Sequence, residues 1–278
     1  MIQNLTLNNG ITIPQLGFGT WLVDASQATE VVGQALEAGY RHIDTAQGYR
    51  NEAEIGKALE ASDISREDLF ITSKLNNNNH KTEDVFSSFD KTLADLQTDY
   101  LDLFLIHWPL PMHYGGDFVS PWKAMIELLN AGRVRAIGVS NFEPEHLDRI
   151  IDATGVVPAV NQIEAHPYFP NDPARAWCRE HGIAIEAWGP LAQGEILDDP
   201  IAREVGAGYG KTGAQAVLRW HIQRGDIIFP KSVNPDRMQQ NLAIFDFELS
   251  TEDMVKIDSL DKGEAGRVGP HPNEFDSI

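Results

Sequence analysis

Four polar side chains follow three consecutive strand-like stretches of the chain. Asp44 ends the stretch 41–44 and precedes Tyr49 at a strand-to-helix turn, Lys74 ends the next stretch, and His107 ends the one after that. Where parallel strands alternate with helices, the carboxyl ends of the strands meet at one face, so we expect these side chains to lie together. Each of them, taken singly, also has a purely structural explanation. Asp44 could cap a helix and Tyr49 could be a packing residue. Lys74 could form a structural ion pair with Asp44, and His107 could be a core histidine.

As a set, these residues suit the delivery of a proton to a substrate oxygen. A tyrosine has a pKa near 10 and holds its proton at neutral pH unless a cation stabilises the phenolate. Lys74 could supply that cation, Asp44 could hold the ammonium, and His107 could hydrogen-bond an oxygen beside the phenol. The sequence shows no activated Ser or Cys nucleophile and no metal-ligand cluster, so we expect no metal. Carbonyl reduction fits, because its alkoxide oxygen needs a proton from Tyr49.

Short apolar runs alternate with segments of helical periodicity, and these elements must position the four side chains. We predict strands at 16–19, 41–44, 69–74, 100–107, 134–140, 159–164, 184–188 and 227–230, and helices at 27–38, 51–62, 82–96, 121–131, 144–153, 172–181, 212–223, 235–241 and 251–260. A hairpin over 5–13 with an Asn9-Gly10 turn precedes them. An open doubly wound sheet would also alternate, but no Gly-x-Gly-x-x-Gly follows the first strand. We therefore predict an α/β fold, a (β/α)8 TIM barrel with an N-terminal β-hairpin and a C-terminal tail helix, as one domain over 1–278.

Composition limits the cellular compartment and the partners that we expect for this chain. It has 278 residues, a net charge of −19 and a single cysteine, Cys178, which excludes an intrachain disulfide and fits a reducing compartment. The start 1–6 lacks the pattern of a signal peptide, and no apolar run approaches the roughly 20 residues that span a bilayer, so we expect a cytoplasmic protein. An acidic surface disfavours nucleic acid and anionic membranes as partners.

Several motifs together resemble the aldo-keto reductase superfamily. They are Asp44-x4-Tyr49, Lys74, His107, Gly138-Val139-Ser140-Asn141-Phe142, Asn161-Gln162-Ile163-Glu164 and Phe229-Pro230-Lys231-Ser232-Val233, and the likeness covers nearly the whole chain. The run 156–164 and the compact length are most similar to the small prokaryotic 2,5-diketo-D-gluconic acid reductases. The resemblance implies that Tyr49 is the general acid, that Lys74 and Asp44 lower its pKa, and that His107 orients the carbonyl.

The same resemblance implies NADPH as the cofactor, with NADH bound more weakly. Ser140, Asn141 and Gln162 match positions that bind the nicotinamide carboxamide, and Trp188 matches the aromatic residue on which the nicotinamide stacks. Lys231 and Arg237 lie at an expected helix start and together can form an anion site. In the family, the residues at these positions bind the 2′-phosphate of NADPH. The full cofactor set is Thr20, Trp21, Ser140, Asn141, Gln162, Trp188, Gly189, Pro190, Leu191, Gln193, Lys231, Ser232, Val233, Arg237, Gln240 and Asn241.

For the substrate, the family resemblance implies a pocket wall made of Trp21, Leu22, Tyr49, Asn76, His107, Trp108 and His271. Asn76 replaces the tryptophan that is common in relatives, so the wall is less apolar there. We expect a monomer that reduces small carbonyl compounds: keto sugars such as 2,5-diketogluconate, and small aldehydes such as methylglyoxal. The alternatives are a nucleotide-binding redox sensor or regulatory barrel with little turnover, and a cofactor-free isomerase or hydrolase, which would leave Lys231 and Arg237 without a purpose.

Overall fold

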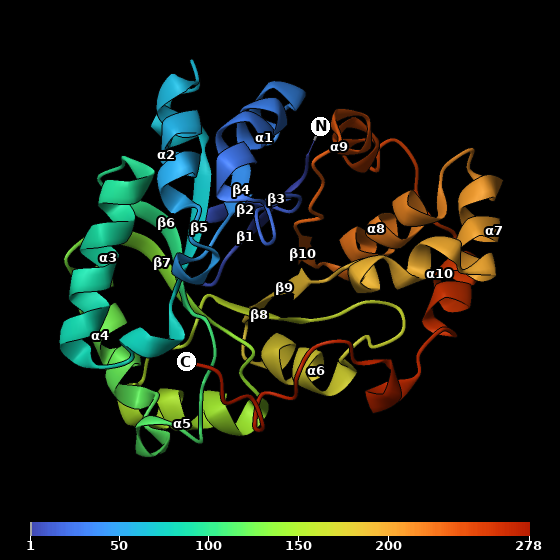
Figure 1. Cartoon of the computed structure of the whole chain (residues 1–278). Coiled ribbons are helices and arrows are strands. Elements are labelled where there is room, and N and C mark those ends of the chain that lie inside the picture. Colours follow the sequence, from blue (N-terminus) through green and yellow to red (C-terminus); the bar gives the residue numbers. More distant parts are fainter. Residues whose placement is uncertain (1) are drawn as a thin grey trace.

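The computed structural model describes residues 2–278; Met1, part of the expected start 1–6, lies outside them. Within these residues, parallel strands form a curled eight-stranded sheet with helices packed around it (Figure 1). The strands are β3 (Phe18–Gly19), β4 (His42–Asp44), β5 (Phe70–Leu75), β6 (Leu101–Ile106), β7 (Val134–Ser140), β8 (Val160–Glu164), β9 (Ala184–Trp188) and β10 (Ile227–Ile228), and each pairs with its neighbour in the chain. The predicted α/β barrel is confirmed.

The helices follow the strands and turn their apolar sides to the sheet. They are α1 (Ala25–Ala38), α2 (Glu52–Ala61), α3 (Thr82–Leu96), α4 (Val119–Asn130), α5 (Pro144–Thr154), α6 (Asp172–Glu180), α7 (Pro200–Gly208), α8 (Gly213–Arg224), α9 (Pro235–Leu242) and α10 (Thr251–Asp258). Short 3-10 helices lie at Gln47–Tyr49, Arg66–Asp68, Asn77–Asn79, Tyr114–Gly116, Ala192–Asp198 and Gly263–Gly266. Local signals set several boundaries: Asp24 caps the start of α1, and Gly39 ends it with a left-handed φ of 115°.

The first and last strands of the sheet close the barrel and are shorter than predicted. Regular pairing covers only Phe18–Gly19 and Ile227–Ile228, instead of 16–19 and 227–230. Leu16 meets Ile228 in a single parallel bridge, and the amide of Gly17 donates to the carbonyl of Ile228 over 2.8 Å. Pro230 has no N–H to extend the ladder, which explains why the last strand stops early.

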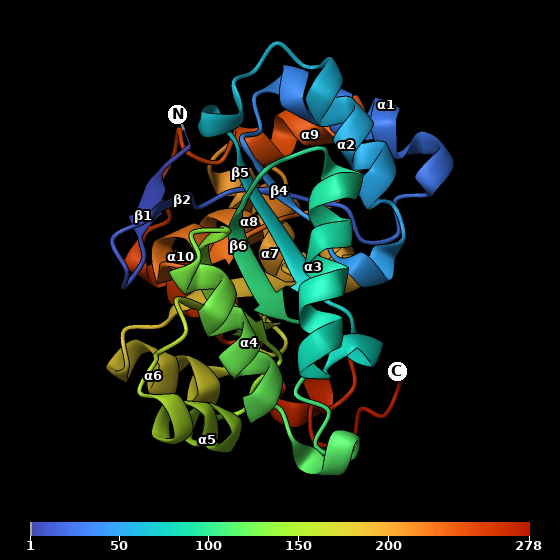
Figure 2. The same ribbon diagram turned by 90° about the vertical axis from the view of Figure 1, so that its left-hand side faces the viewer.

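A hairpin of β1 (Asn4–Thr6) and β2 (Thr12–Pro14) covers the amino-terminal end of the barrel, as the Asn-Gly turn predicts. The side chains of Asn8 and Asn9 donate to the carbonyls of Pro158 and Arg135, just ahead of β8 and within β7. Leu7 and Ile13 of the hairpin segment join the buried side chains inside the barrel. Figure 2 shows the hairpin on one side of the molecule and the C-terminal end on the other. The hairpin therefore leaves the carboxyl ends of the strands as the open face.

Candidate active site

The catalytic residues that the sequence predicts meet at the open end of the barrel. Asp44 ends β4, Lys74 lies near the end of β5, Tyr49 ends the first 3-10 helix, and His107 follows β6. The ammonium of Lys74 donates to Asp44 Oδ1 over 2.7 Å, to the carbonyl of Thr45 over 2.9 Å, and to the hydroxyl of Tyr49 over 3.3 Å. These three bonds use all three Lys74 hydrogens, so the Tyr49 oxygen is an acceptor here and its own proton is free to point into the cavity.

Burial controls the ionisation of this group. It would lower the pKa of Lys74, but the acidic groups of Asp44, Tyr49 and Glu186 together outweigh it and the net pKa is raised. Burial raises the pKa of Tyr49, and the opposing effect of Lys74 is smaller. Asp44 also raises the tyrosine pKa through its negative charge, which corrects the expectation that both residues lower it: Asp44 acts by holding Lys74. Tyr49 is therefore protonated in this site.

His107 is neutral in this environment. Burial lowers its pKa to about 3, with further contributions from the charge of Lys74 and from His80. Its ring lies edge-on to Tyr49, with the ring centres 5.8 Å apart. A neutral imidazole beside the phenol can donate one hydrogen bond to a substrate oxygen without competing as a stronger acid.

The residues expected to bind the nicotinamide form one hydrogen-bonded group with the catalytic residues. Ser140 Oγ donates to the carbonyl of Gln162 over 2.9 Å, and Trp188 Nε1 donates to Asn141 Oδ1 over 2.7 Å. Asn141 Nδ2 in turn donates to the carbonyl of His107 over 3.0 Å. Each of these side chains is oriented by a neighbouring strand end, so a planar ligand would find their positions already set.

One large cavity, of about 1360 Å³, connects the expected catalytic, cofactor and substrate residues. This exceeds the usual range for a drug-sized ligand and has room for a dinucleotide together with a small substrate. From the expected cofactor set its wall includes Trp21, Ser140, Asn141, Gln162, Trp188, Gly189, Pro190, Leu191, Gln193, Lys231, Ser232, Arg237, Gln240 and Asn241. Asn234 caps the start of α9 beside Lys231 and Ser232, and Arg237 lies in the first turns of that helix.

Four expected residues lie off this cavity wall: Lys74, which is fully buried and bonds to Asp44 and Tyr49 on the wall, and the three described next. Thr20 is fully buried and donates to the carbonyl of Asp44, so it supports the turn after β3. Val233 is 48% exposed to solvent. His271 accepts a hydrogen bond from the amide of Asn273 and turns within the C-terminal tail. Leu22, Asn76 and Trp108 line the cavity together with Tyr49 and His107.

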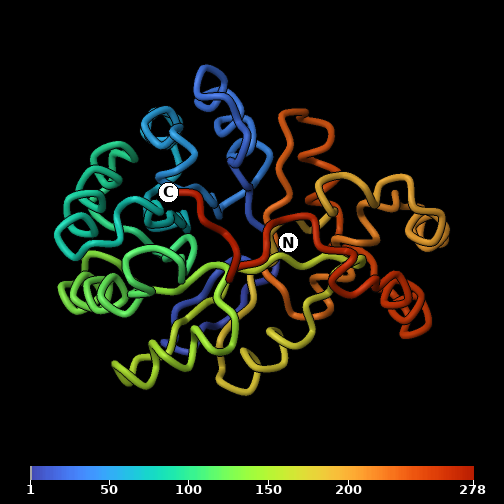
Figure 3. The backbone as a smooth tube through the Cα atoms, turned by 60° about the horizontal axis from the view of Figure 1, so that its bottom comes forward, coloured from blue at the N-terminus to red at the C-terminus, as the bar shows by residue number. Residues whose placement is uncertain are grey.

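The C-terminal tail supplies wall residues: Gly269 and Pro270 are expected from the resemblance, whereas Val268, Phe275 and Ser277 are not. Phe275 stacks on Trp108 with ring centres 4.1 Å apart, and the amides of Val268 and Gly269 donate to the Glu164 carboxylate over 2.6 and 2.9 Å. Figure 3 shows the red tail crossing the face of the ring of elements. The aromatic residue near the end of the chain was the only sequence signal for this contact, since the path of the tail depends on tertiary packing.

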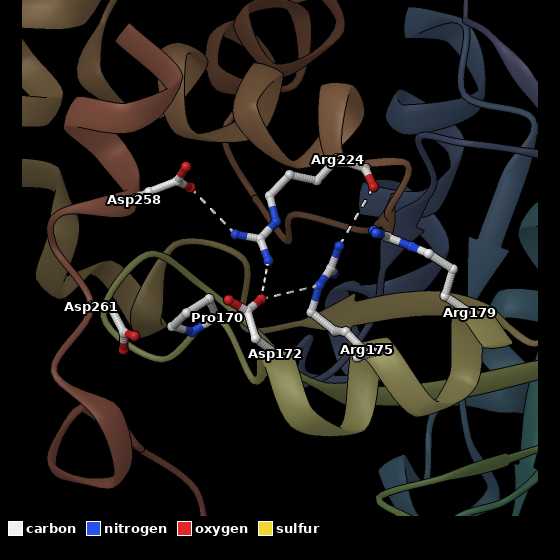
Figure 4. Close-up of a pocket in the computed structure, with 8 residues that line it drawn as sticks. Pro170, Asp172, Arg175, Arg179, Arg224, Asp258 and Asp261 are labelled. Atoms are coloured by element: carbon white, nitrogen blue, oxygen red, sulfur yellow. Dashed lines mark hydrogen bonds and ion pairs between the residues drawn. The ribbon is translucent and has the colours of Figure 1, made fainter. Parts of the chain in front are cut away.

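A second cavity, of about 460 Å³, lies away from this site at the surface beside α6 (Figure 4). Arg224 on its wall pairs with Asp172 and Asp258, and Arg175 pairs with the buried Asp226. Because these arginines already have carboxylate partners, the cavity is no evident anion site. These ion pairs are connected to the wall of the main cavity. Asp226 contacts His221 over 2.8 Å, and the other ring nitrogen of His221 contacts the carbonyl of Pro190, a wall residue, over 3.2 Å.

Among residues 2–278, no three His, Cys, Asp or Glu side chains lie close enough together to hold a metal ion. No helix in the described part of the chain is long and apolar enough to cross a bilayer.

A barrel with this proton-donor group at the carboxyl ends of its strands fits a carbonyl-reducing enzyme, and comparisons with known proteins assign the family. Residues 15–262 match the model of the aldo/keto reductase family. An aldo-keto reductase of Mycolicibacterium smegmatis is 50% identical over 99% of this chain and 98% of its own length. Methylglyoxal reductase DkgA of Salmonella typhimurium is 45% identical over 98% of this chain and 97% of its own length.

Solved structures agree with this assignment. A structure of a Gox0644 variant in complex with NADPH matches with a TM-score of 0.95 at 42% identity and covers 99% of each chain. An aldo/keto reductase from Brucella melitensis matches with a TM-score of 0.90 at 46% identity, over 94% of this chain and all of the other. The chain belongs to the aldo/keto reductase family, and the resemblance seen in the sequence is confirmed.

Proposed function

We propose that this protein reduces keto sugars such as 2,5-diketogluconate and small aldehydes such as methylglyoxal, with Tyr49 as the general acid. The protein is an NADPH-dependent carbonyl reductase of the aldo/keto reductase family. The observation that carries the residue assignment is the hydrogen-bond pattern of Lys74, which leaves the proton of Tyr49 free to point at a bound carbonyl oxygen.

The mechanism follows from the protonation states of the site. NADPH, when bound, supplies a hydride to the carbonyl carbon. Tyr49 gives its proton to the oxygen as negative charge develops there, and Lys74 stabilises the phenolate that remains. Asp44 fixes the ammonium, and neutral His107 donates a hydrogen bond that orients the carbonyl.

The expected cofactor residues fit a phosphorylated dinucleotide. In a chain with a net charge of −19, Lys231 and Arg237 place two cations on the cavity wall beside the capped start of α9. Two such cations suit a phosphate dianion. We assign them to the 2′-phosphate of NADPH, with NADH bound more weakly, and place the nicotinamide between Trp188 and the amide side chains of Asn141 and Gln162.

The substrate class follows from the mixed wall of the cavity. Trp21 and Trp108 provide apolar surface, while Asn76 and Asn77 provide amides on the same cavity wall. This combination suits a small polar carbonyl compound better than a steroid, whose bulk needs a long apolar trough. Relatives named methylglyoxal reductase support the small-aldehyde part of the proposal.

The same proposal covers the organisation of the protein. We assign the chain to one barrel domain that acts as a monomer in the cytoplasm, with small carbonyl compounds rather than nucleic acid or membranes as partners. The acidic net charge of −19 supports the exclusion of polyanionic partners.

A substrate panel followed at the NADPH absorbance band tests the proposal. Methylglyoxal and 2,5-diketogluconate should be reduced with higher kcat/KM than a steroid ketone. NADPH binding without turnover of any carbonyl compound would instead indicate a redox sensor, and preference for the steroid would overturn the substrate class.

A further inference from the structure

Glu186 is a buried carboxyl group directly behind the active site. It lies in the middle of β9, is fully inaccessible to solvent, and does not line the cavity. Its Oε2 accepts a hydrogen bond of 2.8 Å from Gln162 on β8, whereas its Oε1 has no partner. The neighbouring strand β10 consists of Ile227 and Ile228 and therefore carries no charged side chain. The charged groups that face Glu186 are Asp44 on β4 and Lys74 on β5.

Gln162 bridges two carboxyl groups through one nitrogen. Its Nε2 donates to Asp44 Oδ2 over 2.9 Å and to Glu186 Oε2 over 2.8 Å, which uses both amide hydrogens. An amide turned the other way would place its oxygen against the Asp44 carboxylate. The two acids therefore fix the rotation of Gln162 and leave its Oε1 as the atom available to a ligand.

The charge of this group favours a neutral Glu186. Lys74 is already paired with Asp44, so a second carboxylate in the buried space would lack a cation. Burial, together with the charge of Asp44, raises the pKa of Glu186 to about 8. The unpartnered Oε1 is then the atom that holds the proton.

We propose that Glu186 is a positioning residue for carbonyl reduction: it holds the Gln162 amide in the orientation that accepts the nicotinamide carboxamide, and its neutral form leaves Lys74 paired with Asp44 alone. This inference rests on the proposed function for its kinetic consequence, but not for its effect on NADPH binding. When Glu186 ionises, a second negative charge beside Lys74 raises the pKa of Tyr49, so the general acid becomes weaker.

The test uses Glu186→Gln and Glu186→Leu. Gln keeps an acceptor for Gln162 and cannot ionise, so at pH 7 we expect kcat and the NADPH Kd within about twofold of wild type. The wild-type kcat should fall as pH rises through about 8, and this decline should be absent in Glu186→Gln. Leu removes the acceptor, so the NADPH Kd, measured by tryptophan fluorescence, should rise by roughly three- to tenfold, as expected for the loss of one hydrogen bond.

Glu52→Gln is the matched control, because Glu52 is also a buried carboxyl group but contacts Ser73 and Thr92 instead of Gln162. It should keep both the wild-type decline of kcat at alkaline pH and the wild-type NADPH affinity.

The inference is overturned if Glu186→Gln keeps the decline of kcat near pH 8, or if a folded Glu186→Leu binds NADPH as wild type does. If the wild type reduces no carbonyl compound, the proposed function fails while the NADPH titration still decides the role of Glu186. If Glu186→Leu does not fold, the pH profile of Glu186→Gln decides.

Discussion

The arrangement around Lys74 makes the contribution of the Tyr49 hydroxyl measurable on its own. Replacing Tyr49 with Phe keeps the ring but removes the proton, and the Lys74 ammonium keeps its bonds to Asp44 and Thr45. We expect kcat to fall by roughly two or more orders of magnitude, the size of general acid catalysis, with NADPH affinity unchanged. Single-turnover kinetics and a fluorescence titration of NADPH measure the two quantities. Near-wild-type reduction by this variant would refute Tyr49 as the acid.

Cofactor preference should depend on the two cations near α9. Arg237→Ala removes a charge-assisted contact to the 2′-phosphate, worth about 1.5–3 kcal/mol, so the NADPH Kd should rise by roughly tenfold or more while the NADH Kd stays within a few-fold. Arg179→Ala, at the remote cavity, is the control and should change neither. Equal losses for NADPH and NADH would show that Arg237 does not recognise the 2′-phosphate.

The rule that strand ends carry chemistry was enough to predict that Tyr49, Lys74 and His107 lie together, because parallel strands bring their carboxyl ends to one face. Glu186 was missed although it is a charged residue inside the buried strand-like run 184–188. Its contact with Gln162 depends on the pairing register of β8 and β9, in which these two residues lie side by side. Register between distant segments is not readable from one sequence.

The C-terminal tail is coupled to the cofactor site through Gly269. A Cβ added there would lie 2.4 Å from Trp188 Cη2 and 2.9 Å from Glu164 Oε2. Gly269→Ala must therefore displace the tail or the Trp188 ring. Overpacking costs about 1–3 kcal/mol, so the NADPH Kd should rise by at least about fivefold.

Gly33→Ala is the control for this prediction, because a Cβ at Gly33 in α1 meets nothing within 4 Å. It should bind NADPH as wild type does. Fluorescence titration of both variants makes the comparison. Identical affinities would mean that the tail adapts without moving Trp188.

Most elements were predicted within a few residues, but α7 was not predicted at all. Its start carries a clear signal, Asp199 as N-cap with Pro200 in the first turn. The helix is only nine residues long, ends in Gly208 and buries only Ala202, Val205 and Gly206, so its apolar periodicity is short. Before it, the chain passes through Ala192, Gln193 and Gly194 with positive φ. The loop after β9 is thus shaped by contacts such as that of His221 with Pro190, which lie far apart in the sequence.

Buried histidines and buried glutamates should change the free energy of unfolding in opposite directions as pH rises. Burial lowers the pKa of His42 and His80 to about 4 and of His107 to about 3, so the unfolded chain binds protons first and stability falls as pH decreases from 6.5. Burial raises the pKa of Glu52 to about 7 and of Glu186 to about 8, so stability falls as pH rises from 4.5 to these values.

The pKa values of His146 and His221 are also lowered and that of Glu143 is also raised, so between pH 4.5 and 6.5 five histidines oppose three glutamates. From pH 6.5 to 8.5 only the glutamates of these groups act, each with at most about 1.4 kcal/mol per pH unit. We therefore expect the free energy of unfolding to be greatest near pH 6.5. Urea unfolding at pH 5, 6.5 and 8.5 measures it. Glu52→Gln and Glu186→Gln should each reduce the loss at pH 8.5, and a steady rise in stability from pH 6.5 to 8.5 would contradict the assignment.

The hairpin and the C-terminal tail lie at opposite ends of the barrel, so the choice of terminus matters when the enzyme is fused to a domain or tethered to a surface. Phe275 and Ser277 border the cavity, whereas Asn8 and Asn9 are bonded at the far end of the barrel. A fused domain or a surface tether joined ahead of the hairpin would face away from the incoming substrate. The same attachment after residue 278 would begin at the entrance and compete with the substrate for it. Immobilised preparations should therefore keep their turnover when anchored by the first residues and lose it when anchored by the last.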